Sequence, residues 1–191
     1  MKKIIYYATG NNAKFEQVKH FVEKYNKNLE IKQFIGDIPE IQTMDQKAIA
    51  ISKALQAWDK IKKPLLVDDS GLYFTQYNNF PGTLTKFVYE GLGYKGLLKL
   101  VEDDNRAYFL VTLVFIFDEN KFKIFEGKIE GVIKPPVDEP PHPQLPMNNI
   151  FYPKGSNQSY AKYYIEKEDG LVKDNARIKA VRKFLSWYEN Q

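Results

Sequence analysis

The stretch LLVDDSGL, residues 65–72, places two acidic residues directly after an apolar run. Residues 65–67 are typical of a buried strand, and we expect this strand to end before Asp68 and Asp69. Two interpretations stay open. Because Asp, Ser and Gly all favour turns, the segment could be a simple strand-to-loop connection. Two carboxylates at a strand end could instead belong to a metal–phosphate site.

The residues before this stretch predict two strand–helix units. A strand at 3–8 is followed by the glycine turn TGNNAK at 9–14 and by an amphipathic helix. A second strand at 29–35 and a second helix at 45–62 come next. Since strands that alternate with helices pair in parallel through crossover connections, we expect parallel strands in this half.

The second half of the chain favours antiparallel strands. We expect a short helix at 93–102, a buried strand at 107–117 and a return strand at 121–133. A last helix is predicted to follow an N-cap at Asp174 or Asn175. Because neither a repeat nor a low-complexity linker separates the halves, we expect a single α/β domain with a mixed sheet over the whole chain.

The composition excludes several classes of function. None of the 191 residues is a cysteine, which excludes thiolate catalysis and cysteine zinc sites. A net charge of +4 without a basic run argues against a nucleic-acid partner and suits anionic small molecules. The longest apolar stretch is well below the roughly 20 residues of a membrane helix, so we expect no membrane partner and a cytoplasmic protein. Six of the ten prolines lie in residues 135–146, which predicts a stiff surface loop of unassigned role.

The turn TGNNAK is a candidate phosphate site. A glycine turn between a strand and a helix presents backbone N–H groups and the positive end of the helix dipole, both of which suit phosphate. Lys14, in the first helical turn, would add a positive charge at the same place. The alternative is a plain connection between the two elements.

Three carboxylates follow strands of the predicted parallel group. Glu40 follows the second strand, and Asp68 and Asp69 follow the third. Because the carboxyl ends of parallel strands meet at one edge of the sheet, these groups are expected to converge and repel one another unless they share a cation. Mg²⁺ is the expected cation, since it takes one or two carboxylates together with water and phosphate oxygens.

The position of Lys53 stays open at this stage. The expected apolar stripe of its helix consists of Ala48, Ile51, Leu55, Trp58 and Ile61. Lys53 points away from this stripe, so it is either a solvent-facing lysine or one that reaches a phosphate. With a metal, two lysines and backbone donors, the candidate site has the components of polyphosphate chemistry.

The chain resembles the inosine triphosphate pyrophosphatase family, also called the Ham1-like nucleotide pyrophosphatases. The resemblance runs nearly from end to end and includes the opening TGNxxK motif, an acidic residue after the second strand, a helix lysine and a VDDSGL signature. The segments that carry it are TGNNAK (9–14), IPEIQ (38–42), SKA (52–54), LLVDDSGL (65–72), FPG (80–82), FEGKIEGVI (125–133), IFYPKGSNQSYA (150–161) and NARIKAVRKF (175–184).

The resemblance implies a fold, an activity and roles for residues. The implied fold is a long twisted mixed sheet with flanking helices, in two lobes around a substrate cleft, usually as a homodimer. The implied activity is hydrolysis of ITP, dITP or XTP to the monophosphate and pyrophosphate. Implied metal ligands are Glu40, Asp69 and Asp68; implied catalytic residues are Asp69, which orients water, Lys14 and Lys53. Implied substrate-binding residues are Thr9, Gly10, Asn11, Lys14, Lys53, Ser70, Gly71, Phe151, Lys173 and Arg177.

This sequence departs from the family in the base pocket. The family segment GFGYDPIF corresponds here to QLPMNNIF, 144–151, and the family triplet Ser-His-Arg to NAR, 175–177. The replaced positions are Leu145, Pro146, Asn148, Asn175 and Ala176, and Phe151, Tyr152 or Tyr160 could supply another aromatic platform. Three hypotheses therefore stay open: the family activity, the same chemistry with a shifted base preference such as modified pyrimidines, and a nucleotide-binding homologue without turnover.

Overall fold

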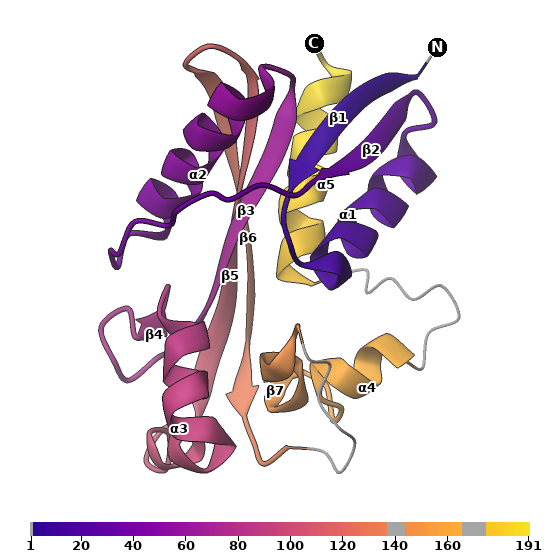
Figure 1. Cartoon of the computed structure of the whole chain (residues 1–191). Helices are drawn as coiled ribbons and strands as arrows, with labels where there is room; N and C mark the ends of the chain where they lie inside the picture. Colours follow the sequence, from indigo (N-terminus) through magenta and orange to yellow (C-terminus); the bar gives the residue numbers. More distant parts are fainter. Residues whose placement is uncertain (1, 137–143, 166–174) are drawn as a thin grey trace.

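The fold is built on one mixed sheet of seven strands in the order β2-β1-β3-β5-β6-β7, with β4 paired to β3. The computed structural model describes residues 2–136, 144–165 and 175–191 (Figure 1). The first half contains β1 (Lys3–Ala8), α1 (Asn12–Tyr25), β2 (Leu29–Phe34), α2 (Gln46–Ile61) and β3 (Leu65–Phe74). The second half contains β4 (Pro81–Gly82), α3 (Thr85–Lys99), β5 (Arg106–Asp118), β6 (Lys121–Ile133), the 3-10 helix η1 (Pro146–Asn149), β7 (Phe151–Pro153), α4 (Tyr160–Ile165) and α5 (Ala176–Glu189). The predicted α/β fold with a long mixed sheet is confirmed.

Both predicted strand–helix units are present, and β1 pairs in parallel with β2 and with β3. Each helix starts at a polar cap. The Asn11 side chain accepts a hydrogen bond from the Lys14 backbone N–H, and the Asp45 side chain accepts from the first turn of α2. These caps explain why α1 and α2 begin at residues 12 and 46.

The prediction that the third strand ends before the aspartates is wrong. β3 continues to Phe74 because β5 pairs with it in antiparallel register from Leu65 to Phe74. On its other side, β1 pairs with β3 only opposite Leu65 and Leu66. Asp68 and Asp69 therefore lie in the middle of a strand but just past the end of β1, where the sheet opens.

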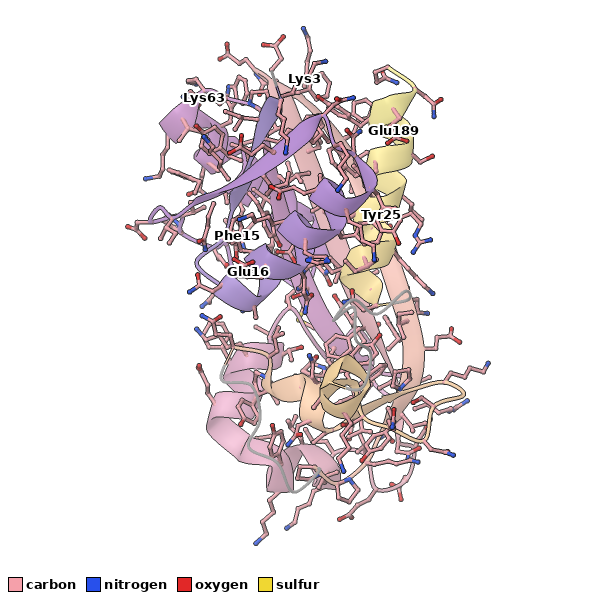
Figure 2. The ribbon with its side chains drawn as sticks, turned by 90° about the vertical axis from the view of Figure 1, so that its right-hand side faces the viewer. Lys3, Phe15, Glu16, Tyr25, Lys63 and Glu189 are labelled. Carbon is pink, nitrogen blue, oxygen red and sulfur yellow. The ribbon has the colours of Figure 1, made fainter. Side chains whose placement is uncertain are left out.

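Helices cover both faces of the sheet (Figure 1). One core cluster joins α1 and α5 to one face and includes Val22, Phe184 and Leu66. The other joins α2 to the opposite face and includes Ala54 and Val67. Figure 2 shows α1 and α5 side by side, where the Asn26 amide at the end of α1 donates to Glu189 at 3.2 Å.

The second half agrees with the prediction in its strands and differs in one helix. β6 has the predicted bounds and pairs with β5 through a tight turn at Asn120, whose φ of 57° is left-handed. The helix expected at 93–102 begins at Thr85 and is kinked at Gly93. Asn175 is the N-cap of α5.

Two further predictions fall partly outside the described residues. Of the proline-rich loop, residues 137–143 lie outside them, and Asp174 does so as well. Among the helices in the described part of the chain, none has the length and apolarity needed to cross a bilayer.

Candidate active site

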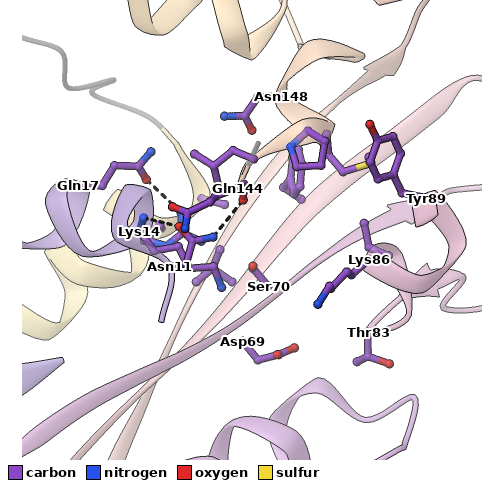
Figure 3. Close-up of a pocket in the computed structure, with 18 of the residues that line it drawn as sticks. Asn11, Lys14, Gln17, Asp69, Ser70, Thr83, Lys86, Tyr89, Gln144 and Asn148 are labelled. Carbon is purple, nitrogen blue, oxygen red and sulfur yellow. Dashed lines mark hydrogen bonds between the residues drawn. The ribbon is translucent and has the colours of Figure 1, made fainter. Parts of the chain in front are cut away.

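A cleft of about 810 Å³ lies where α1, α2 and α5 face α3 and η1. Figure 3 shows Asn11 and Lys14 on one side, Lys86 and Tyr89 on the other, and Asp69 between them. The cleft thus collects charged groups from elements far apart in the sequence.

Asp68 is held by three donors on the α1 and α5 side of the sheet. Its Oδ1 accepts hydrogen bonds from the Tyr7 hydroxyl at 2.6 Å and from Lys14 Nζ at 3.3 Å. Its Oδ2 accepts from Arg177 Nε at 3.2 Å and Nη2 at 3.1 Å. Burial of Asp68 opposes ionisation, but the charges of Lys14 and Arg177 and the Tyr7 hydrogen bond outweigh it, so its pKa lies well below the usual range.

These contacts argue against the predicted metal role of Asp68. Both carboxylate oxygens already accept charge-assisted hydrogen bonds, and a metal ion would have to displace them beside two cations. Asp68 instead ties α1 and α5 to β3. Burial lowers the pKa of Lys14, and the charge of Asp68 opposes this shift.

Asp69 lies on the opposite face, toward α2, and lines the cleft. Its Oδ1 is 3.8 Å from Lys53 Nζ, and its Oδ2 is buried without a hydrogen-bond partner among the described residues. Burial, more than the neighbouring charges, raises the pKa of Asp69 to about 6. A buried oxygen with an open coordination position is what a metal ion or a reacting water needs.

Lys53 lies on the sheet-facing side of α2 and lines the cleft, so it is not a solvent-facing lysine. Its contact with a phosphate stays a prediction. The buried face of this helix consists of Gln46, Ile49, Ala50, Ala54, Ala57 and Trp58. Lys53 Nζ donates to Glu40 at 2.6 Å. Burial acts to lower the pKa of Lys53, but the hydrogen bond and charge of Glu40, with the charge of Asp69, outweigh burial and raise it.

The TGNNAK turn contacts a segment from the other side of the cleft. Asn11 Nδ2 donates to the Gln144 carbonyl oxygen at 3.0 Å (Figure 3). The Ala13 N–H donates to Gln144 Oε1 at 3.2 Å. Thr9 Oγ1 accepts from the Asn11 N–H at 3.1 Å and so shapes the turn. Gly10 lines the cleft beside it. Gln144 thus accepts hydrogen bonds from two groups at the start of α1.

Of the other predicted site residues, some line the cleft and others do not. Ser70 and Arg177 line the cleft. Gly71 packs against Gly82, whose carbonyl oxygen would lie 2.6 Å from an added Cβ, so its role is close packing in a strand and not the expected turn. Phe151 is fully buried, packs on Phe109 and Tyr160 and does not line the cleft, which argues against the predicted substrate contact. Lys173 lies outside the described residues.

Several cleft residues were not identified from the sequence. Lys86 reaches into the cleft from the first turn of α3, as Figure 3 shows, and its amine is 3.8 Å from Glu90. Thr83 and Gln17 also line the cleft. The signal that could have located Lys86 is its position just after the FPG segment, at the start of a helix that the apolar pattern did not reveal.

The end of the cleft away from Asp69 is largely apolar. The residues that line it are Phe87, Tyr89, Phe109, Leu145, Pro146, Met147, Asn148 and Tyr160. η1 is fixed there by the Tyr94 hydroxyl, which donates to the Pro146 carbonyl oxygen at 2.8 Å. The cleft therefore combines a charged end with an aromatic end, which suits a ligand with an anionic part and a flat apolar part.

Comparison with known proteins identifies the family. The model of the Ham1 family matches residues 5–187. The chain belongs to the Ham1 family. A dITP/XTP pyrophosphatase of Saccharolobus solfataricus is 33% identical over 184 residues, covering 95% of this chain and 92% of that protein. One of Methanopyrus kandleri is 29% identical over 189 residues, covering 97% and 96%.

Solved Ham1 structures share the fold. The Ham1 protein of Coxiella burnetii aligns with a TM-score of 0.77 at 22% identity and covers both chains completely, 100% of each. The Ham1 protein of Staphylococcus aureus aligns with a TM-score of 0.76 at 20% identity, covering 98% of this chain and 99% of that one. The described part of the chain therefore has the fold of the Ham1 structures.

Proposed function

We propose that this chain is a Mg²⁺-dependent nucleoside triphosphate pyrophosphatase. It hydrolyses non-canonical purine nucleotides such as ITP, dITP and XTP to the monophosphate and pyrophosphate, and so removes them from nucleotide pools. The observation that carries the proposal is the buried Asp69 carboxylate, with one unpartnered oxygen among the described residues, beside Lys53 in a cleft with an aromatic end. The relatives named dITP/XTP pyrophosphatases support the same activity.

The residues present fit a magnesium ion bound together with substrate. Among the described residues, no group of three or more His, Asp or Glu side chains could form an all-protein metal cage. Mg²⁺ typically takes only one or two carboxylates and completes its shell with water and phosphate oxygens. Asp69 and Glu40, both bound to Lys53, are the two carboxylates that we assign to it. The bound ion would neutralise charge on the phosphate oxygens.

The side chains of the cleft divide the remaining work. Lys14 and Lys53, one from each side of the sheet, would hold the phosphates, and Lys86 would close on them from α3. The raised pKa of Asp69, about 6, suits a carboxylate that accepts a proton from water. The water oxygen forms a bond to the α-phosphorus, the bond from that phosphorus to the bridging oxygen breaks, and pyrophosphate leaves with the electron pair.

A shifted base preference is the second candidate. It is favoured by Leu145 and Asn148 at the aromatic end, where the family segment has an aromatic residue and an aspartate. Tyr160 and Phe109 line the same end and are stacked with ring centroids 5.9 Å apart, so either could replace the missing platform. A homologue without turnover would have no use for a water-orienting Asp69.

We further propose that the protein is a cytoplasmic homodimer. Three apolar side chains between β2 and α2 are exposed and would suit a subunit contact: Ile35, Ile41 and Met44. Sedimentation of the purified chain tests the oligomeric state, and a monomer at micromolar concentration would contradict the dimer.

The experiment that tests the activity is pyrophosphate release with Mg²⁺ over a panel of nucleotides. The panel contains ITP, dITP, XTP, the standard ribonucleotides and deoxynucleotides, and modified pyrimidine triphosphates. Preference for ITP, dITP and XTP is expected. Preference for another base would support the second candidate, and no release from any nucleotide would overturn the proposal.

A further inference from the structure

Gln46, the first residue of α2, is a buried polar side chain that the proposed chemistry does not use. It is only 4% exposed. Its Nε2 donates to the backbone carbonyl oxygen of Asp69 at 2.8 Å and to that of Leu110 at 3.1 Å. One amide group therefore joins the start of α2 to β3 and to β5 immediately beside the proposed metal ligand.

The orientation of this amide is fixed by a tyrosine. The Tyr73 hydroxyl donates to Gln46 Oε1 at 2.5 Å, which leaves Nε2 facing the two carbonyl oxygens. Burial, with the charge of Asp69, raises the pKa of Tyr73, so the phenol stays a hydrogen-bond donor at any working pH. Tyr73 is itself fixed by stacking on Tyr108, with ring centroids 4.9 Å apart and an interplanar angle of 1°.

The same helix carries Lys53 two turns later. Residues seven positions apart lie on the same side of an α-helix, so Gln46 and Lys53 both face the sheet. Gln46 fixes where the start of α2 sits against Asp69, and Lys53 comes within 3.8 Å of the carboxylate of the same residue. A shift of α2 along the sheet would change this separation directly.

We propose that Gln46, oriented by Tyr73, is a positioning residue that sets the placement of Asp69 and Lys53 for the reaction. The inference rests on the proposed pyrophosphatase function. Misplacement of a reacting group by about 1 Å can cost on the order of 100-fold in rate. The contact of Gln46 with Asp69 is therefore expected to act mainly on kcat. Lys14 and the aromatic end do not contact Gln46 and still bind the nucleotide.

The test compares three variants in steady-state hydrolysis of ITP with Mg²⁺. Gln46→Met keeps the length of the side chain and removes its hydrogen bonds, and Gln46→Glu keeps the acceptor for Tyr73 but removes the donor. Both are expected to lower kcat by about 10- to 100-fold, with a smaller rise in KM because Lys53 also holds the phosphates. Tyr73→Phe keeps the donor and frees its orientation, so a smaller fall in kcat is expected.

Val22→Ala is the matched structural control. Val22 is fully buried in the cluster on the other face of the sheet, so this variant lowers stability without changing the contacts of Gln46 and Tyr73. At a temperature where all variants are folded, it is expected to keep the wild-type kcat. Gln46 variants that lose stability like Val22→Ala but keep the wild-type kcat would overturn the proposal.

A second readout separates this inference from the proposed activity. In isotopically labelled protein, the side-chain amine resonances of Lys53 are expected to shift in Gln46→Met and not in Val22→Ala. This measurement needs no turnover, so an inactive wild-type protein would overturn the pyrophosphatase function while leaving the positioning role testable. Unchanged Lys53 resonances in Gln46→Met would overturn the positioning role.

Discussion

Asp68 and Asp69 are adjacent on β3, yet their side chains lie on opposite faces of the sheet. Asp68 meets Lys14 and Arg177 on the face covered by α1 and α5, and Asp69 meets Lys53 on the face covered by α2. Successive side chains of a strand alternate between faces, so two adjacent carboxylates can have different charged neighbours. The two aspartates therefore do different work.

Asp69→Asn is expected to abolish turnover without unfolding the protein. An amide cannot accept the proton from water, and general base catalysis typically contributes about 10²–10⁴-fold. Because burial disfavours the ionised carboxylate, the neutral amide is expected to leave the melting temperature unchanged or slightly higher. The check is kcat together with thermal unfolding; wild-type activity in this variant would contradict the assigned role.

Asp68→Asn is expected to destabilise the fold. The substitution leaves the buried charges of Lys14 and Arg177 without their partner, and removing one member of a buried ion pair costs about 3–5 kcal/mol. Since the pKa of Asp68 is depressed in the folded protein, its stabilising contribution is also lost as pH falls. Urea unfolding measures both effects, and a loss below about 1 kcal/mol would contradict the structural role.

Asp69 is expected to lower the free energy of unfolding as pH rises, whereas Asp68 raises it. Its pKa is raised from 3.8 to about 6 on folding, so the folded state binds the proton more tightly than the unfolded state. The free energy of unfolding therefore falls as pH rises between these two values. Thermal unfolding between pH 4 and pH 8 should show this slope in the wild type and lose it in Asp69→Asn.

Bound Mg²⁺ is expected to oppose the loss of stability that Asp69 causes at high pH. A deprotonated Asp69 can bind Mg²⁺, whereas a protonated one cannot. Addition of Mg²⁺ with a non-hydrolysable triphosphate analogue is therefore expected to raise the melting temperature more at pH 8 than at pH 5. An equal shift at both pH values would argue against Asp69 as a ligand.

Leu145→Phe is expected to strengthen binding of the base. An aromatic ring on the apolar end of the cleft adds stacking, which is typically worth about 1–3 kcal/mol per base. The KM for ITP should fall by about 5- to 100-fold, and kcat should change little. Tyr160→Leu, in the same assay, shows whether the existing platform is Tyr160, and an unchanged KM in both variants would place the base elsewhere.

The sequence predicted the elements whose side-chain pattern is decided by burial. The hairpin of β5 and β6 was correct because its strands are long and apolar and its turn is compact. The predicted third strand was too short because two adjacent charged residues are unusual in the middle of a buried strand. They are tolerated here because each aspartate meets a cation on its own face.

The sequence was least informative for helices with weak apolar patterns. α3 buries only Leu97, and no side chain caps its start at Leu84, so its first turns were missed together with Lys86. In α2 the large apolar residues Ile51 and Leu55 are only half-buried, while alanines face the sheet. The predicted stripe was therefore rotated, and Lys53 could not be placed from spacing.

In the proposed reaction, water attacks the α-phosphorus at Asp69. Hydrolysis of ITP or XTP with Mg²⁺ in ¹⁸O-labelled water, followed by mass analysis of both products, tests it most directly. Pyrophosphate is the expected product, with the label in the nucleoside monophosphate and with no turnover in Asp69→Asn. Label in the released phosphate product, or release of orthophosphate from the γ-position, would contradict it.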